Sequence, residues 1–368
     1  MTFGFTPPHI RLPLVNKLYL VSLILFLALG SLALGGSAFQ DEAIEGKIKL
    51  APLHIPAPAP DGRPKMLEGW ESMDCVECHK EIAQEWAGTL HALAWVDERY
   101  QEAIANKRRP QSCHGCHIPQ PLNLRPLGGK PRPRNPNAEV PEETLHTGIS
   151  CISCHQGPEG EMLGPFADAE PTDAHASKQG AAFGEGTLAD AICINCHRTN
   201  VGPVIGIAKD FETTRQADKG LSCVGCHMSA VDRPAALVPQ EDGSLLASQV
   251  RRGRSHALQT PRDPDFLAGA FGLEARLTAT GAELLITNQA GHRVPGLKTR
   301  SMTFTVTLID ADGESTHLID SRSYLPVDGT IAIAIEAKTP PTKLHVKATH
   351  LWAGVKGPVV FIDKSLNL

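Results

Sequence analysis

The sequence predicts two parts of different fold class, a mostly helical and irregular part followed by an antiparallel β-sandwich-like part. Three observations support this division. All ten cysteines lie between residues 75 and 227. From residue 273 onward, apolar residues recur at every second position, which is the pattern of half-buried strands. Only 5% of the residues are aromatic, so we expect something other than large side chains to fill part of the interior.

The N-terminal segment, residues 1–38, predicts export. Arg11 and Lys17 precede an uncharged run that closes on small residues at positions 36–38. This is the pattern of a secretion signal that is cleaved after residue 38. The apolar run is also long enough to span a bilayer, so an uncleaved membrane anchor stays open as the alternative. Both interpretations place the body of the protein in the periplasm or on the extracellular face of the cytoplasmic membrane.

A proline-rich tether is predicted over residues 39–66, because five prolines fall between residues 51 and 64. The cysteine-rich part is assigned to residues 67–260. Within it, residues 81–100 carry apolar side chains at spacings of three and four, which predicts one amphipathic helix. Residues 119–141 contain seven prolines, and we interpret them as a surface insertion.

Every cysteine belongs to a Cys-x-x-Cys-His motif, and none is left over. Two thiols at this spacing can form thioethers with the vinyl groups of one haem, and the following histidine then lies under the iron as its proximal ligand. Zinc sites and disulfides use the same cysteine spacing but do not require a histidine after every pair. We therefore predict five covalent c-type haems, attached at Cys75, Cys78 and His79; Cys113, Cys116 and His117; Cys151, Cys154 and His155; Cys193, Cys196 and His197; and Cys223, Cys226 and His227.

The five motifs span 153 residues, or about 31 for each haem. A chain this short cannot wrap each haem separately, so we expect the haems to contact one another and their stack to form the core of this part.

The second axial ligands decide between electron transfer and catalysis, because a low-spin electron-transfer haem has two strong ligands whereas a catalytic haem keeps one position open. His114, inside the second motif, is a weak candidate, and no role is assigned to His54, His317, His345 or His350. The stronger candidates are His91 on the expected helix, His146, His256 after an arginine-rich run, and His292 in a Gly-His-Arg-Val-Pro-Gly loop, and His175 is a weaker candidate.

Residues 270–368 are assigned to the β-rich domain. Asp312-Gly313 and Asp328-Gly329 supply turns between runs of alternating apolar residues. No cysteine lies in this domain, so it attaches no haem covalently.

The formal charge is −5 and becomes −7 once residues 1–38, with two basic residues and no acid, are removed (33 − 40). The haem propionates add further negative charge. This balance argues against nucleic-acid binding and favours redox protein partners with a basic docking face. A membrane quinol-oxidising complex or a terminal reductase fits that description, and a homo-oligomer is left open.

The run from Cys75 to Ala92 resembles the opening of the cytochrome c-554-like multihaem cytochromes, the cytochrome c-552/4 domain family. Later blocks around His146, His256 and residues 291–296 resemble related multihaem proteins, so the resemblance covers about residues 67–300. It implies distal ligation by His91, His146, His256 and His292, and haems stacked in parallel and perpendicular pairs.

Two departures from the family pattern affect local geometry. Pro295 meets Gly296 directly, where the family loop usually has a threonine between them. Gln156 stands before Gly157, where relatives often run straight from the motif histidine to Gly-Pro.

The leading functional hypothesis is a pentahaem electron carrier with no catalytic residue. The alternative is a multihaem oxidoreductase that acts on a small nitrogen or sulfur oxyanion at one haem without a distal ligand. No lysine replaces a motif histidine, which separates the chain from pentahaem nitrite reductases. A subunit of a haem filament is a third hypothesis.

We expect the intact mass of the denatured protein to show five haem increments on a chain that starts near residue 39. Four or fewer increments would remove one motif from the set. A mass that includes residue 1 would favour the uncleaved anchor.

Overall fold

The computed structural model of the chain describes residues 66–120, 140–157, 160–168, 174–180, 183, 190–200, 206–322, 325–352 and 355–368. The expected export segment and nearly all of the tether lie outside these residues, as do residues 121–139 of the expected insertion. The chain divides into two units, residues 1–49 and 50–368. The elements described below belong to the second unit. In the described residues, no helix is long and apolar enough to cross a membrane.

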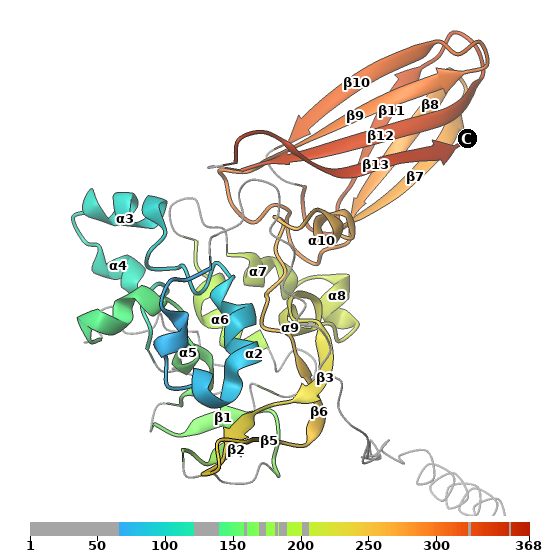
Figure 1. Cartoon of the computed structure of the whole chain (residues 1–368). Helices are drawn as coiled ribbons and strands as arrows, with labels where there is room; N and C mark the ends of the chain where they lie inside the picture. Colours follow the sequence, from blue (N-terminus) through green and yellow to red (C-terminus); the bar gives the residue numbers. More distant parts are fainter. Residues whose placement is uncertain are drawn as a thin grey trace, which may run out of the picture. The chain divides into compact units, whose positions relative to one another are not determined.

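Short helices carry the five motifs (Figure 1). Four motif histidines lie inside a helix, and His117 follows the end of one. The brevity of these helices leaves many backbone carbonyls free to accept hydrogen bonds from side chains. In chain order the elements are η1 (Trp70–Ser72), α2 (Val76–Ala87), α3 (Glu98–Ala105), α4 (Gln111–His114), η2 (Glu142–Thr147), α5 (Ile152–His155), α6 (Ala191–His197), α7 (Ile207–Phe211), α8 (Arg215–Asp218) and α9 (Cys223–His227).

The single helix expected over residues 81–100 is wrong, because two helices and a turn segment replace it. α2 ends before Gly88, a residue that lowers helix stability. α3 begins only after Asp97, whose carboxylate caps the helix by accepting the backbone N–H of Tyr100 at 3.1 Å. His91 therefore lies in the turn segment between the two helices.

A crossing chain segment explains why the backbone is not helical at His91. The carbonyl of His91 accepts the N–H of Ala94 at 3.1 Å within the turn and the N–H of Ile149 at 2.9 Å from the crossing segment. Gly148 sits so close to this segment that a Cβ there would lie 2.7 Å from the same carbonyl oxygen. The indole of Trp86 also donates to the carbonyl of Ile149 at 2.8 Å. Together these contacts position His91.

Three two-stranded ribbons complete the motif-bearing part. β1 (Met162–Gly164) and β2 (Ser177–Gln179) pair in parallel. β3 (Ala230–Pro234) pairs antiparallel with β6 (Val250–Arg254), and β4 (Leu237–Pro239) pairs antiparallel with β5 (Leu245–Ala247). A carbonyl of β1 accepts a hydrogen bond from the motif histidine His155, and Arg233 of β3 pairs with Glu85 beside His256, as described below.

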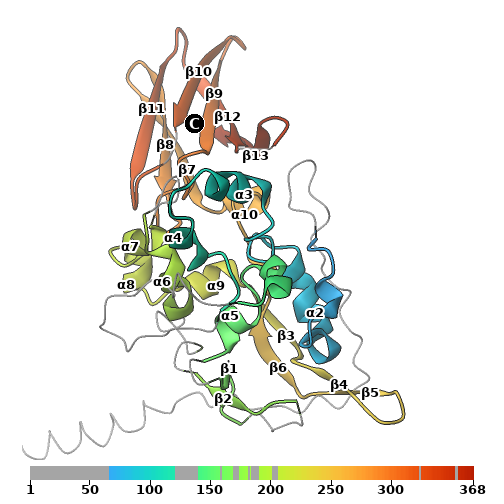
Figure 2. The same ribbon diagram turned by 90° about the vertical axis from the view of Figure 1, so that its left-hand side faces the viewer.

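The C-terminal part consists of two antiparallel sheets, with strand orders β10-β9-β12-β13 and β11-β8-β7. Figures 1 and 2 show these strands together, with the motif-bearing helices outside them. The helix α10 (Pro264–Ala268) precedes them. The strands are β7 (Phe271–Thr278), β8 (Gly281–Asn288), β9 (Ser301–Asp310), β10 (Ser315–Arg322), β11 (Thr330–Glu336), β12 (Pro341–Leu351) and β13 (Val359–Asn367).

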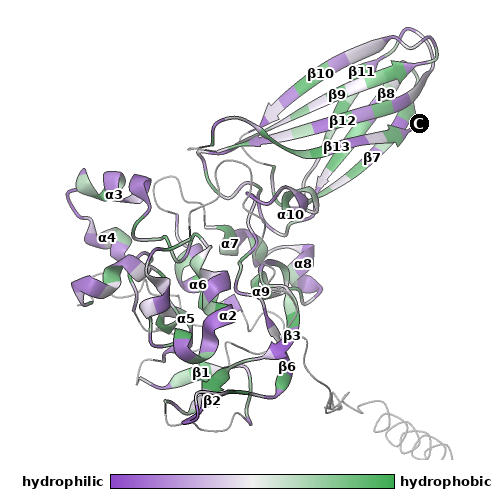
Figure 3. Ribbon diagram, in the orientation of Figure 1, coloured by the Kyte–Doolittle hydropathy of each residue, from purple (hydrophilic) through white to green (hydrophobic). Residues whose placement is uncertain are grey.

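One apolar cluster is shared by both sheets. β9 has perfect alternation of buried and partly buried residues, and the strands in Figure 3 alternate between hydrophobic and hydrophilic residues. Phe304 is fully buried and contacts Phe271 and Phe361 edge-on, with ring centroids 5.9 and 6.0 Å away. The predicted helices and C-terminal antiparallel sheet region are therefore confirmed. The classification as a sandwich and the haem-stacked core stay predictions.

We expect Phe304→Ala to destabilise the C-terminal sheets by about 3 to 5 kcal/mol, because the surrounding rings cannot close the cavity. The change is measured as the shift in chemical denaturation followed by circular dichroism. Ile319→Ala on β10, where the side chain is 65% exposed, is the matched control and should shift stability by less than about 0.5 kcal/mol. Equal effects of the two substitutions would contradict a shared core around Phe304.

Candidate haem sites

The sulfur atoms of different motifs lie next to one another, and none of the ten cysteines forms a disulfide. Cys75 of the first motif is hydrogen-bonded to Cys151 of the third. Cys193 of the fourth motif is hydrogen-bonded to Cys223 of the fifth. Since each motif would attach its own haem, these contacts bring the attachment points of two haem pairs together.

Four motif histidines each face another histidine, and the distance between the two ring centroids is nearly the same in all four pairs. Two imidazoles bound to opposite sides of one metal, with metal–nitrogen bonds of about 2 Å, have ring centroids about 6 Å apart. The observed pairs fit an iron atom between them. They are His79 with His175 at 6.2 Å, His91 with His197 at 6.0 Å, His155 with His256 at 6.1 Å, and His227 with His292 at 6.2 Å.

The mutual tilt of the two rings differs among the pairs. The interplanar angles are 19° for His79 with His175, 28° for His155 with His256, and 15° for His227 with His292. His91 and His197 are inclined at 50°. The last pair therefore presents a different ligand field from the other three.

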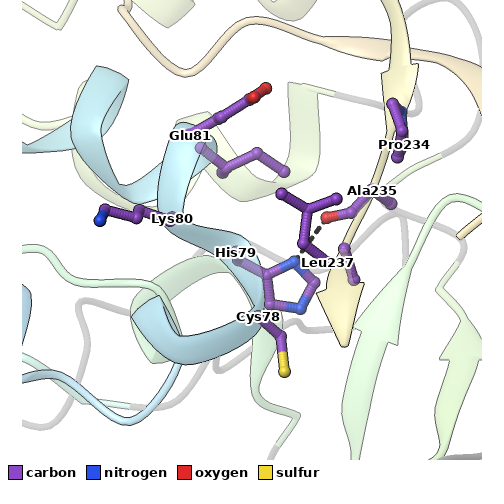
Figure 4. Close-up of a pocket in the computed structure, with 9 residues that line it drawn as sticks. Cys78, His79, Lys80, Glu81, Pro234, Ala235 and Leu237 are labelled. Atoms are coloured by element: carbon purple, nitrogen blue, oxygen red, sulfur yellow. Dashed lines mark hydrogen bonds between the residues drawn. The ribbon is translucent and has the colours of Figure 1, made fainter. Parts of the chain in front are cut away.

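Backbone carbonyls orient the motif histidines by accepting a hydrogen bond from Nδ1. His79 donates to Ala235 at 2.6 Å in a hollow between α2 and the β3–β4 segment (Figure 4). A carbonyl can only accept, so the proton lies on Nδ1 and Nε2 is left as the metal-binding atom. The same arrangement holds for His117 with Ala94 at 2.6 Å, His155 with Leu163 at 2.8 Å, and His227 with Gln259 at 2.7 Å.

Burial keeps these imidazoles neutral, which is the form that binds a metal. Burial lowers the pKa of His155 below its ordinary value, with a smaller contribution from the charge of His79. The pKa of His197 falls to about 4 through burial and through the nearby His227 and His292. The electrostatic effect of His227 and His292 on His197 also places the fourth and fifth motifs close together.

His256 is held by an ion pair between two elements of the motif-bearing part. The Glu85 carboxylate on α2 accepts the backbone N–H of His256 at 2.7 Å. The same carboxylate receives both terminal nitrogens of Arg233 on β3, at 2.8 and 2.9 Å, and both side chains are only 13% exposed. Such a bidentate pair fixes geometry as well as charge.

His292 is held by a second ion pair of the same design. Arg293, the next residue, donates its Nε and Nη2 to Asp210 on α7 at 2.6 and 2.7 Å. The buried amide of Asn288 donates to the carbonyl of His292 at 2.9 Å. The loop between β8 and β9 is thereby fastened to the motif-bearing part. The sequence analysis did not identify Glu85, Asp210 or Asn288. The arginine directly after His292 is the one sequence feature that indicates such an ion pair.

The His117 site differs from the other four. Tyr100 stacks on the His117 ring at a centroid distance of 3.8 Å and an angle of 3°. Burial, together with Cys113 and Cys116, raises the pKa of Tyr100, so its hydroxyl stays protonated. In the described part of the chain, no second histidine faces His117 at the spacing of the four pairs.

Within the described residues, two candidate distal ligands have no second imidazole at the ring-to-ring distance of the four pairs. His146 lies in η2 and bonds through Nδ1 to the carbonyl of Glu143 at 2.7 Å. His114 lies edge-on to Trp95, with ring centroids 5.5 Å apart. Distal ligation by His146 stays a prediction.

We expect Asp210→Asn to weaken the interaction that positions His292 by about 2 kcal/mol, because Arg293 then loses its charged acceptor. Part of one haem population should become high-spin, as measured by electron paramagnetic resonance of the oxidised protein. The matched control is Glu212→Gln two residues away, where the carboxylate that pairs with Arg198 is 37% exposed against 9% for Asp210. It should leave the spectrum unchanged. An unchanged spectrum in Asp210→Asn would show that the clamp does not position His292.

Two comparisons find cytochromes that are similar to this chain. Residues 74–156 match the family described as cytochrome c554 and c-prime. The fold is similar to the crystal structure of a penta-heme cytochrome c552 from Thermochromatium tepidum, with a TM-score of 0.51 and 15% identity, covering 80% of this chain and 97% of that one. A structural-genomics target matches 27% of this chain with a TM-score of only 0.17. No curated protein sequence matches the chain. Residues 74–156 are thus similar to the cytochrome c554 and c-prime family, and the chain shares its fold with a penta-heme cytochrome c552.

Proposed function

We propose that the protein is an exported pentahaem c-type cytochrome that relays single electrons between redox protein partners. The observation that carries this proposal is the set of four imidazole pairs at 6.0 to 6.2 Å. When bound, haem supplies reversible one-electron chemistry at an iron whose axial positions are both filled by strong ligands. In this proposal His79, His155, His197 and His227 are proximal ligands, and His175, His256, His91 and His292 are their respective distal partners.

The chain's own residues favour rapid transfer without ligand exchange. Carbonyl hydrogen bonds and ion pairs hold both members of a pair before and after the electron arrives, so little rearrangement is needed. The sulfur contacts between Cys75 and Cys151, and between Cys193 and Cys223, support close approach of neighbouring haems. These features suit a relay.

The domain division belongs to the same proposal. Residues 67–260 carry the five attachment motifs, and residues 270–368 form the β-sandwich-like domain. The second domain contributes His292 to the fifth motif's site through the β8–β9 loop. Export places the motifs on the outer side of the cytoplasmic membrane, where partners with basic faces would dock on an acidic surface.

A second candidate function is reduction or oxidation of a small nitrogen or sulfur oxyanion at the haem attached to Cys113 and Cys116. The observation that favours it is the aromatic neighbour of His117. Tyr100, and not a histidine, is the ring that contacts His117 in the described residues. An exchangeable position at this one site would be compatible with four coordinated neighbours that deliver electrons to it.

We expect the reduced protein to bind carbon monoxide at no more than one haem in five. His292→Ala should raise that number by one, because the haem of His227 then loses its distal ligand. His345→Ala on β12, where the ring contacts Ser365 and Asp363, is the control and should leave the stoichiometry unchanged. The measurement is a spectrophotometric titration.

Binding of carbon monoxide at two or more haems in the unaltered protein would contradict the four pairings. Turnover of nitrite or another small oxyanion with a reduced donor would replace the carrier function with the second candidate.

A further inference from the structure

Three segments meet where the C-terminal sheets adjoin the motif-bearing part. In the register of β9 with β12, Ser301 pairs with Leu351 and Met302 with His350. Arg300, which precedes β9, therefore lies across from Trp352, which follows β12. The third segment is the chain before α10, where Arg262 places its guanidinium 6.0 Å from the centre of the Trp352 ring.

Hydrogen bonding and ring packing join these segments further. His350 lies between β12 and the loop, and its Nδ1 donates to the carbonyl of Pro261 at 3.0 Å. The His350 and Trp352 rings are 4.8 Å apart. Trp352 is 5% exposed, so the indole closes the cluster on one side.

Two polar side chains of the cluster, Arg300 and His350, are buried. Arg300 is 8% exposed and His350 is 1% exposed. In the described residues, no ion pair is formed by the Arg300 guanidinium, and Nε2 of His350 is buried without a hydrogen-bond partner. Asp97, which caps α3, acts electrostatically on Arg262. An uncompensated buried cation is costly, so the geometry calls for an anion.

The electrostatics agree with the geometry. Burial, followed by the charges of Arg262 and Arg99, lowers the pKa of Arg300 to about 10. Burial and the charge of Arg300 lower the pKa of His350 to about 4, although the carbonyl of Pro261 opposes this. The pKa values of both groups are shifted toward the uncharged form, as expected for buried cationic side chains that lack an anionic partner.

We propose that Arg300, Arg262 and His350 form a binding site for a carboxylate or small oxyanion, filled in the loaded protein by a propionate of one of the covalently attached haems. The guanidinium of Arg300 would supply paired donors to the carboxylate. His350 would donate from Nε2 once the anion favours protonation of its ring. The C-terminal sheets then anchor a haem by charge, in addition to the His292 loop.

The position of the cluster supports a propionate as the source. Gln259, whose carbonyl orients His227, lies two residues before Pro261. Asp97 caps α3 and Arg99 lies in its first turn, next to Tyr100, which stacks on His117. The cluster therefore borders two haem sites. This inference rests on the proposed haem loading, which the haem count of each preparation tests separately.

The decisive experiment is a potentiometric titration of the holoprotein carrying Arg300→Gln. Loss of a positive charge beside a propionate disfavours the reduced haem, so one of the five midpoints should move to lower potential and the others should stay. Arg300→Lys keeps the charge and should retain a midpoint near that of the unaltered protein. Arg276→Gln, which removes a surface arginine paired with Glu283 on the neighbouring strand, is the matched control and should change no midpoint.

A second arm separates a propionate from a free anion. Nitrite and sulfate are titrated separately into the unaltered holoprotein by calorimetry at low ionic strength. If a propionate fills the site, neither anion binds saturably there. Saturable binding that Arg300→Gln abolishes, with all midpoints unchanged before anion is added, would support the same site with a free oxyanion as its ligand.

The proposal is overturned if Arg300→Gln changes no midpoint and no anion binding depends on Arg300. Each variant is first shown by intact mass to carry as many haems as the unaltered protein. If Arg300→Gln fails that check, His350→Gln and Arg300→Lys are compared in its place, and His350→Gln should lower the same single midpoint. A haem count other than five in the unaltered protein would count against the proposed function instead.

Discussion

A separation of about 6 Å between paired imidazole rings is the constraint that organises this protein. His79 and His175, for example, come from segments far apart in the sequence, yet their rings stand 6.2 Å apart and nearly parallel. Each such pair ties a motif to a distant part of the chain. The C-terminal sheets take part in this arrangement, because the loop between β8 and β9 carries His292 to His227.

The irregular backbone follows from the same constraint. Carbonyls that orient motif histidines, such as Ala235 and Gln259, lie outside long helices, where they are free to accept. The apolar cluster around Trp70 and Trp86 is small, whereas the C-terminal sheets have an extensive core of their own. We propose that metal ligation, buried ion pairs and the volume of bound haems give the motif-bearing part the stability that the sheets obtain from apolar packing.

Local patterns in the sequence predicted the motifs and the strands. They did not predict the contacts between residues that are far apart in the sequence. The motif spacing predicts the attachment residues, and the alternation around Phe304 locates the strands, because both patterns depend on neighbouring residues. The turn segment around His91 was not predicted, because its contact with the N–H of Ile149 comes from a segment distant in the sequence. Tertiary contacts also set the partner of each proposed distal histidine, the ion pair of Glu85 with Arg233 and the burial of His350. These contacts have no local signature in the sequence.

The most direct test of the account is a crystallographic map of anomalous scattering at the iron edge. It should contain five peaks, one beside each motif histidine. Four of them should lie midway between the rings of the pairs His79 with His175, His91 with His197, His155 with His256, and His227 with His292, and the fifth should lie beside His117. An iron bound by two histidines from different pairs, or a pair with no iron between its rings, would contradict the pairing on which the proposed electron relay depends.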